Sequence, residues 1–204
     1  MNRRDFLKAA TALTSWAVLP TSGLFIPSIA KANIETRDFW TRDRVLWVRR
    51  AASGEQFRVV YWTQAGGVDI ANYVRLCYLL RDIPEQQTVM MDVNLLNLMY
   101  GLQYWNDLEV GHPTPYIVTS GQRMPAHNAI VEGAAYDSMH KYARATDGLI
   151  PGLPLHTLAA RAEFFGFGGV GVYDTHTHVD TGRVRKWDGT KRQRPHPVPR
   201  SPHL

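Results

Sequence analysis

The chain has 204 residues, 45% of them apolar, with six Trp, nine Tyr and one cysteine. This length suits a single compact domain, and the aromatic content excludes a chain that is disordered throughout. The net charge of +5 is concentrated at the two ends, and the intervening body carries a net charge of −4. We therefore expect no nucleic-acid partner, because that function requires a basic face.

The first 32 residues have the layout of an export signal. Two arginines, Arg3 and Arg4, are followed by Phe-Leu-Lys, an apolar run over 9–19 and a small-x-small cleavage site at 30–32. The paired arginines make this segment similar to a twin-arginine signal. The apolar run is too short to span a membrane.

These features predict the cellular location of the protein and its domain organisation. We expect a signal peptide over 1–32, a mature domain over 33–187 and a disordered basic tail over 188–204. The mature protein is expected in the periplasm or another extracytoplasmic space. No stable membrane insertion is expected after signal cleavage.

Periodicity in the mature chain predicts five strands and three helices. In chain order these are strands over 44–50 and 56–63, helices over 70–82 and 92–105, a strand over 114–119, a helix over 155–165, and strands over 170–173 and 177–180. The linker Ala-Ala-Ser-Gly-Glu favours a hairpin between the first two strands. A tight connection is expected to place the last two side by side.

The single cysteine, Cys77, lies in an apolar run. Alone it can form neither an intramolecular disulfide nor a Cys-rich metal site, so we interpret it as a small core residue. No haem, iron–sulfur or dinucleotide motif is present. An exported redox protein nevertheless stays an alternative, which a visible absorption band would favour.

Four residues have the composition of a catalytic metal site. His140 precedes Asp147 by seven positions, across what we expect to be a small loop, and His176-x-His178 follows in a strand-like run. Residues two apart in a strand point the same way, so both imidazoles should face one side of the sheet. Two His and one carboxylate leave a zinc ion one open position for water.

The spacing of these residues resembles that of a known family. The motifs are Ser138-x-His140-x6-Asp147, His176-x-His178, an upstream Ser-Gly-Gln-Arg ending at Arg123, and His178-Val-Asp180-Thr-Gly. They resemble the zinc D-Ala-D-Ala carboxypeptidase and murein endopeptidase family, which shares its fold with hedgehog signalling domains. The likeness is greatest to a twin-arginine-exported branch and extends over 44–187.

The resemblance implies roles for the matching residues. His140, Asp147 and His178 match the zinc ligands, and His176 matches the catalytic base. Arg123 matches an arginine that holds substrate carboxylate or carbonyl groups.

Two further residues match positions beside the ligands in the family. Ser138 is expected to contact substrate or a ligand, and Asp180 to orient a ligand or only to close its strand. Two departures are visible: Ala143 replaces a usual glycine, and Gln122 replaces an aromatic residue expected to face the substrate.

The resulting prediction is a single α+β domain of the hedgehog/D-Ala-D-Ala-peptidase type, with a small antiparallel sheet flanked by helices. We expect a monomer whose Zn²⁺ lies on the open face of the sheet. The predicted reaction is hydrolysis of peptide bonds in the stem or cross-link peptides of peptidoglycan. The alternative is a non-catalytic peptidoglycan-binding protein of the same fold.

Overall fold

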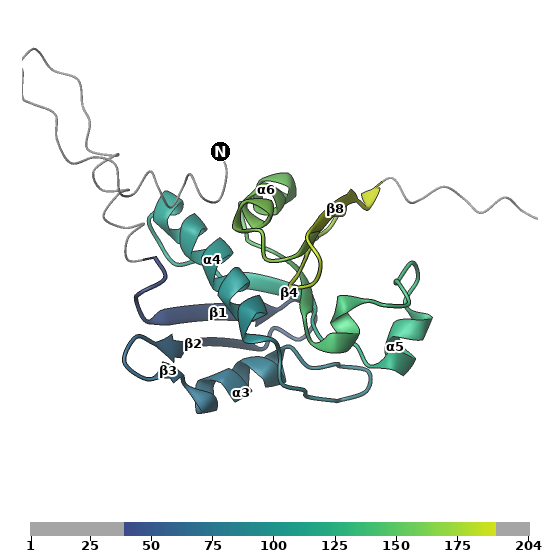
Figure 1. Cartoon of the computed structure of the whole chain (residues 1–204), viewed down its shortest axis with the longest axis horizontal. Helices are drawn as coiled ribbons and strands as arrows, with labels where there is room; N and C mark the ends of the chain where they lie inside the picture. Colours follow the sequence, from purple (N-terminus) through teal and green to yellow (C-terminus); the bar gives the residue numbers. More distant parts are fainter. Residues whose placement is uncertain (1–38, 191–204) are drawn as a thin grey trace, which may run out of the picture.

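The computed structural model describes residues 39–190, which form one mixed sheet of eight strands with helices packed on it (Figure 1). The strand order is β3-β2-β1-β4-β5-β7-β6-β8. The strands are β1 (Arg44–Arg50), β2 (Gln56–Thr63), β3 (Gly67–Val68), β4 (Tyr116–Ser120), β5 (Ala145–Leu149), β6 (Gly169–Val172), β7 (Thr177–Asp180) and β8 (Arg185–Asp188).

The α+β class is confirmed, but the expectation of a small antiparallel sheet is wrong. Two neighbouring pairs, β1 with β4 and β6 with β8, are parallel. A parallel neighbour requires the chain to cross over between the strands. Between β1 and β4 that crossover includes two long helices, and between β6 and β8 it includes β7.

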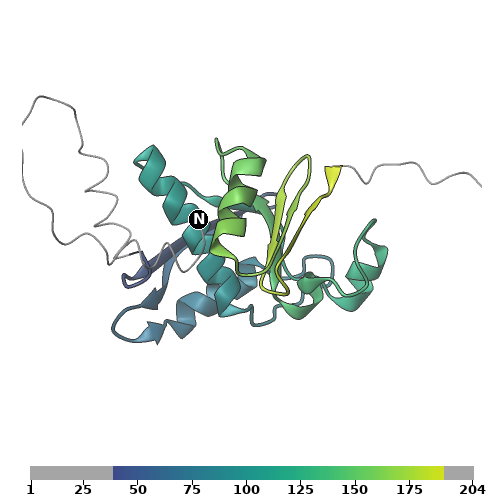
Figure 2. The same cartoon turned by 45° about the horizontal axis from the view of Figure 1, so that its top comes forward.

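The helices are α3 (Ile70–Leu79), α4 (Val93–Val110), α5 (Pro125–Ile130) and α6 (Leu155–Phe165), with a 3₁₀ turn, η1, at Met139–Tyr142. Helix α3 packs on β2, α4 on β1, and α6 on β6 and β7 (Figures 1 and 2). Buried side chains occur on several sides of α4, which makes it the central helix of the fold.

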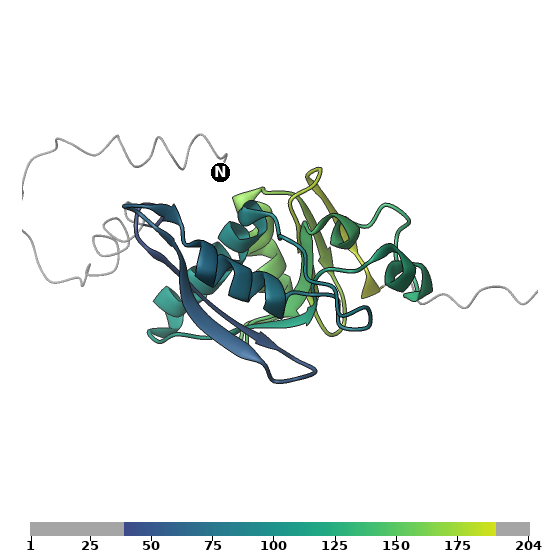
Figure 3. The same cartoon turned by 90° about the horizontal axis from the view of Figure 1, so that it is seen from below.

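Helix α4 begins at a side-chain cap and runs five residues beyond the predicted end. The Asn94 N–H donates to the carboxylate of Asp92, and Gly111 ends the helix in the left-handed conformation at φ 77°. Helix α3, in contrast, ends three residues earlier than predicted. The predicted bounds of α6 and of the β1–β2 hairpin match the structure. That hairpin lies at one side of the molecule (Figure 3).

Cys77 is fully buried in the core, as predicted, and the N–H of Met91 donates to its sulfur over 3.3 Å. The predicted signal over 1–32 and most of the predicted tail lie outside the described residues. Strand β8 includes Asp188, so the sheet continues one residue past Trp187. No helix within 39–190 is long and apolar enough to cross a membrane.

Candidate metal centre

The structure brings three of the predicted site residues together. His140, Asp147 and His178 are all buried, and their ligand atoms lie within 4.8 Å of one another. His140 Nε2 lies 3.2 Å from Asp147 Oδ1 and 3.2 Å from His178 Nδ1. His178 Nδ1 lies 2.8 Å from the same carboxylate oxygen. Three potential ligand atoms therefore converge on one point.

Neighbouring strands and a short turn position these side chains. Asp147 on β5 is the direct cross-strand partner of His178 on β7, so both side chains leave the same face of the sheet. His140 lies in η1, which reaches over that face. A short connection separates η1 from β5, as expected, and Asp147 is the third residue of β5.

A backbone carbonyl determines which nitrogen of His140 faces the centre. His140 Nδ1 lies 2.6 Å from the carbonyl oxygen of Gly121, which can only accept a hydrogen bond. Nδ1 therefore carries the proton, and Nε2 presents its lone pair to Asp147. Gly121 itself packs against the backbone of Leu80, where a Cβ would overlap the Leu80 carbonyl oxygen.

Asp180 performs the same task for His178. Its Oδ2 lies 3.1 Å from His178 Nε2, so this nitrogen donates and Nδ1 turns its lone pair to Asp147. Burial would raise the pKa of Asp180, but hydrogen bonds from His178 and from two backbone N–H groups outweigh it and lower the pKa. The carboxylate therefore stays ionised.

With these tautomers, three lone pairs face one another and no proton separates them. Such an arrangement is repulsive unless a positive charge lies between the groups. Burial would lower the pKa of His178, yet its hydrogen bonds to Asp147 and Asp180 outweigh burial and raise it. A positive charge, whether a proton or a metal ion, is therefore favoured at this point. Two nitrogens and one oxygen are also donors that suit a catalytic zinc ion.

Arg123 contacts Asp147 directly. Its Nη2 donates to Asp147 Oδ2 over 2.6 Å, and its Nε donates to the Ser120 hydroxyl over 2.9 Å. Burial would raise the pKa of Asp147, but His140 and His178 outweigh it and hold the pKa well below its usual range. Arg123 therefore fixes the carboxylate that completes the cluster, in addition to lining the adjoining cavity.

The cluster opens into a cavity of about 690 Å³, which is also lined by Ser138 and His176. His176 directly precedes β7 and, like His178, faces this cavity, as the alternation predicts. Its ring stacks on Tyr173 with centroids 4.6 Å apart, and burial lowers its pKa. The imidazole is therefore neutral near pH 7 and able to accept a proton.

Two aromatic residues of the cavity wall were missed by the sequence analysis. The ring of Trp187 on β8 lies 5.1 Å from that of His178, and its Nε1 donates to the Tyr173 hydroxyl over 3.0 Å. Tyr173 in turn stacks on His176. In the structure Gly171 pairs with Trp187, and a Cβ on Gly171 would overlap the indole, a relationship that the local sequence does not reveal.

The two departures from the family pattern have structural explanations. Gln122 is buried and does not line the cavity at the metal centre. Ala143 adopts the left-handed conformation at φ 57°, which favours glycine. The turn nevertheless closes, since the Ala143 N–H donates to the carbonyl of His140.

Comparison with known proteins agrees with this geometry. A family model described as peptidoglycan L,D-endopeptidase MepK matches residues 40–187. A relative from Haemophilus influenzae, named a probable peptidoglycan L,D-endopeptidase MepK, is 34% identical over an alignment of 196 residues that covers 92% of this chain and 96% of the relative. The predicted murein endopeptidase family is confirmed, whereas export by the twin-arginine route stays a prediction. The chain belongs to the peptidoglycan L,D-endopeptidase MepK family.

Proposed function

We propose that this chain is a zinc endopeptidase that hydrolyses L,D cross-link peptides of peptidoglycan outside the cytoplasmic membrane. The observation that carries the proposal is the convergence of three lone pairs, from His140, Asp147 and His178, at the base of a cavity. The substrate follows from the name of the relative and of the family. The location follows from the signal-like start of the sequence.

His140, Asp147 and His178 would hold the zinc ion. When bound, zinc would supply Lewis acidity toward the peptide carbonyl and would lower the pKa of water. The chain's own residues do the remaining work. His176, neutral and held by Tyr173, accepts the proton of the attacking water and later delivers it to the leaving amine.

Arg123 and the cavity wall orient the substrate. One N–H of the Arg123 guanidinium donates to Asp147, and the residue also lines the cavity. Its other N–H groups can therefore donate to a substrate oxygen. Ser138 directly precedes η1 and adds a hydroxyl to the cavity wall. Trp187 and Tyr173 supply apolar surface for the alkyl portions of a peptide.

The test is digestion of purified peptidoglycan by the zinc-loaded mature protein, followed by chromatography of the muropeptides. We expect cross-linked dimers to be converted to monomers. His176→Ala should lower kcat by about 10² to 10⁴-fold with its zinc content unchanged, because it removes only the base. His156→Ala, an exposed histidine on α6, is the matched control and should behave as wild type.

The principal alternative is a peptidoglycan-binding protein without turnover. Binding of wall material that stays uncut at every pH and with every divalent metal tried would favour that alternative. A redox protein would instead give a visible absorption band. Localisation is tested by fractionation of cells, with Arg3→Lys/Arg4→Lys as the variant that should block export if the twin-arginine prediction is correct.

A further inference from the structure

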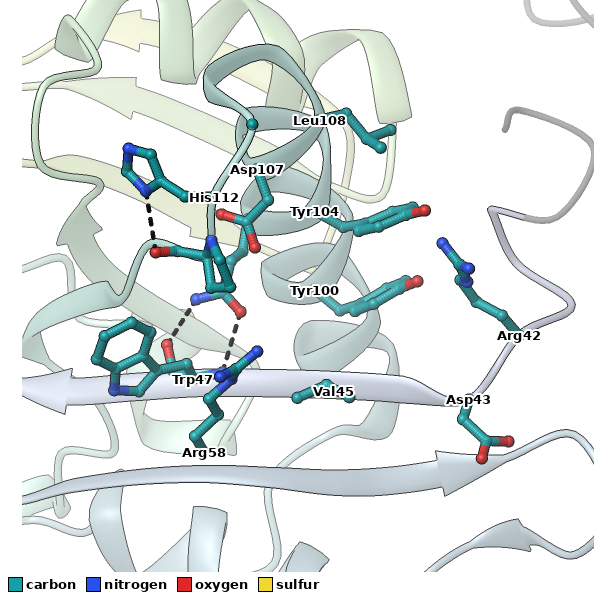
Figure 4. A pocket seen from close by; sticks show the side chains of 13 residues that line it. Arg42, Asp43, Val45, Trp47, Arg58, Tyr100, Tyr104, Asp107, Leu108 and His112 are labelled. Atoms are coloured by element: carbon teal, nitrogen blue, oxygen red, sulfur yellow. Dashed lines mark hydrogen bonds between the residues drawn. The ribbon is translucent and has the colours of Figure 1, made fainter. Parts of the chain in front are cut away.

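A second groove lies away from the metal centre, between the β1–β2 hairpin and the C-terminal half of α4 (Figure 4). Its volume is about 580 Å³, and none of its lining residues lines the cavity at the metal centre. Its floor is β1 and its wall is α4, and Gly111–Pro113 closes one end. The groove therefore requires an explanation of its own.

Half of β1 has a free edge at this groove. Strand β4 pairs with β1 only from Val48 onward, so the preceding residues have no strand on that side. Gln103 of α4 replaces the missing strand at one residue. Its Oε1 accepts from the Trp47 N–H over 3.0 Å, and its Nε2 donates to the Trp47 carbonyl over 2.6 Å (Figure 4).

The next residue with the same orientation is Val45. The Arg50 N–H donates to the carbonyl of Glu55, the residue just before β2, and alternate residues of an antiparallel strand bond to opposite sides. Residues 48 and 46 therefore face β2, whereas residues 47 and 45 face the groove. Val45 is 37% exposed and lines the groove, and β4 does not reach it, so its groove-facing N–H and C=O have no strand partner on that side.

Two arginines flank this edge. Arg42 lies over the ring of Tyr104, 5.0 Å from its centroid, and Arg58 lies 5.9 Å from that of Trp47. Within residues 39–190 neither guanidinium forms an ion pair with a carboxylate. Both are exposed.

The two carboxylates of the groove are already engaged. Asp43 accepts from the N–H of Gln64, and Asp107 accepts from the N–H and the hydroxyl of Thr114. The groove thus offers a backbone edge, ring faces and two arginines that form no close ion pair within residues 39–190, although Arg58 interacts electrostatically with Asp107. These features complement an extended peptide that carries carboxylates.

We propose that this groove binds an acidic stem peptide of the wall polymer by strand addition to β1 at Val45, apart from the peptide being cut. This inference rests on the proposed function, which supplies a polymer with many such peptides. One backbone pair and two exposed charges make a weak site. The groove strengthens binding when one polymer occupies both the groove and the cavity at the metal centre, because the second contact is then intramolecular.

The test compares a polymeric with a small substrate. Arg42→Gln/Arg58→Gln is measured for co-sedimentation with insoluble peptidoglycan and for hydrolysis of soluble cross-linked muropeptide dimers. Arg75→Gln is the control, because Arg75 is also an exposed arginine over a ring, that of Phe57, but lies outside the groove. We expect about tenfold weaker binding to the polymer for the double variant only, with dimer hydrolysis unchanged.

Val45→Pro is an independent second variant, since it removes the groove-facing N–H and leaves the bonds of β1 to β2 in place. It should weaken polymer binding similarly. If both variants bind the polymer as tightly as the wild-type protein does, the proposal is overturned. It is also overturned if the variants lose dimer hydrolysis to the same extent as polymer binding. A concentration-dependent dimer in sedimentation velocity that Val45→Pro abolishes would also overturn it, by identifying a second copy as the occupant.

The design separates this proposal from the proposed function. Polymer binding is repeated after chelation, when no hydrolysis occurs. If the wild-type protein never cleaves dimers but the double variant still binds the polymer more weakly, the catalytic proposal fails and the groove stands. If dimers are cleaved and the double variant binds the polymer as wild type does, only the groove proposal fails.

Discussion

Asp180 lies 3.1 Å from Nε2 of His178, and this contact determines that Nδ1 is the nitrogen facing Asp147. The carboxylate is fully buried and also accepts from the N–H groups of Gly169 and Gly182 and from Arg185. Asp180 is thus held by four donors, only one of which belongs to the metal centre. Its role in orienting His178 can be separated from direct metal binding.

Asp180→Asn should weaken metal binding by about 10- to 100-fold. An amide has one acceptor oxygen in place of two, so it cannot accept from all four donors, and the ring of His178 loses its fixed orientation. Zinc affinity is measured by competition with a chromophoric chelator. Asp188→Asn, at an exposed position on β8, is the control. Equal affinities in the two variants would contradict this role for Asp180.

Metal removal should lower thermal stability. Zinc at about 100 times its Kd adds about 2.7 kcal/mol to the free energy of unfolding, which for a domain of this size is a rise in Tm of roughly 5–10 °C. Calorimetry of chelator-treated protein with and without added zinc measures it. His140→Ala should show no such rise. A zinc-induced rise of the same size in that variant would place the ion elsewhere.

Arg123→Gln should reduce both metal affinity and catalysis, since Arg123 donates to Asp147 and also lines the cavity. We expect about tenfold weaker zinc binding and a loss of roughly 10² to 10³-fold in kcat/KM at saturating zinc. Arg183→Gln, an exposed arginine, is the control. An effect on KM alone, with zinc affinity unchanged, would show that Arg123 acts only on the substrate.

The sequence predicted those elements whose local pattern and tertiary environment agree. In the β1–β2 hairpin, the two β-rich runs and the linker between them gave the correct strand bounds, and the inward positions Leu46, Val48 and Tyr61 are fully buried. The ligand set was proposed from the family resemblance, and the structure brings its three members together. Their spacing alone would not have identified them.

Strands β5 and β8 escaped prediction because their pattern depends on neighbours distant in sequence. Strand β5, with the sequence ATDGL, has small or polar residues buried on both faces and no apolar alternation. Its Gly148 is required because a Cβ would overlap the ring of Tyr116. Strand β8 is short, with three charged residues out of four, and it forms only because β6 offers an edge. Trp187 could therefore not be placed beside His178 from local sequence.

The wall contributed by Trp187 leads to a last prediction, at the glycine opposite it. Gly171→Ala should displace the indole, because the new Cβ would overlap its ring, and the ring would then lose its contacts with His178 and Tyr173. We expect a destabilisation of about 1–3 kcal/mol and a changed tryptophan emission spectrum.

Activity should fall in the same variant, because His176 stacks on the tyrosine that Trp187 holds. Gly66→Ala is the matched control: the nearest atom to its Cβ is the Thr63 hydroxyl at 3.4 Å, so stability should change by less than about 0.5 kcal/mol. Chemical denaturation and dimer hydrolysis measure both effects. If Gly171→Ala lost stability but kept full kcat/KM, the aromatic wall would serve folding alone and His176 would not depend on it.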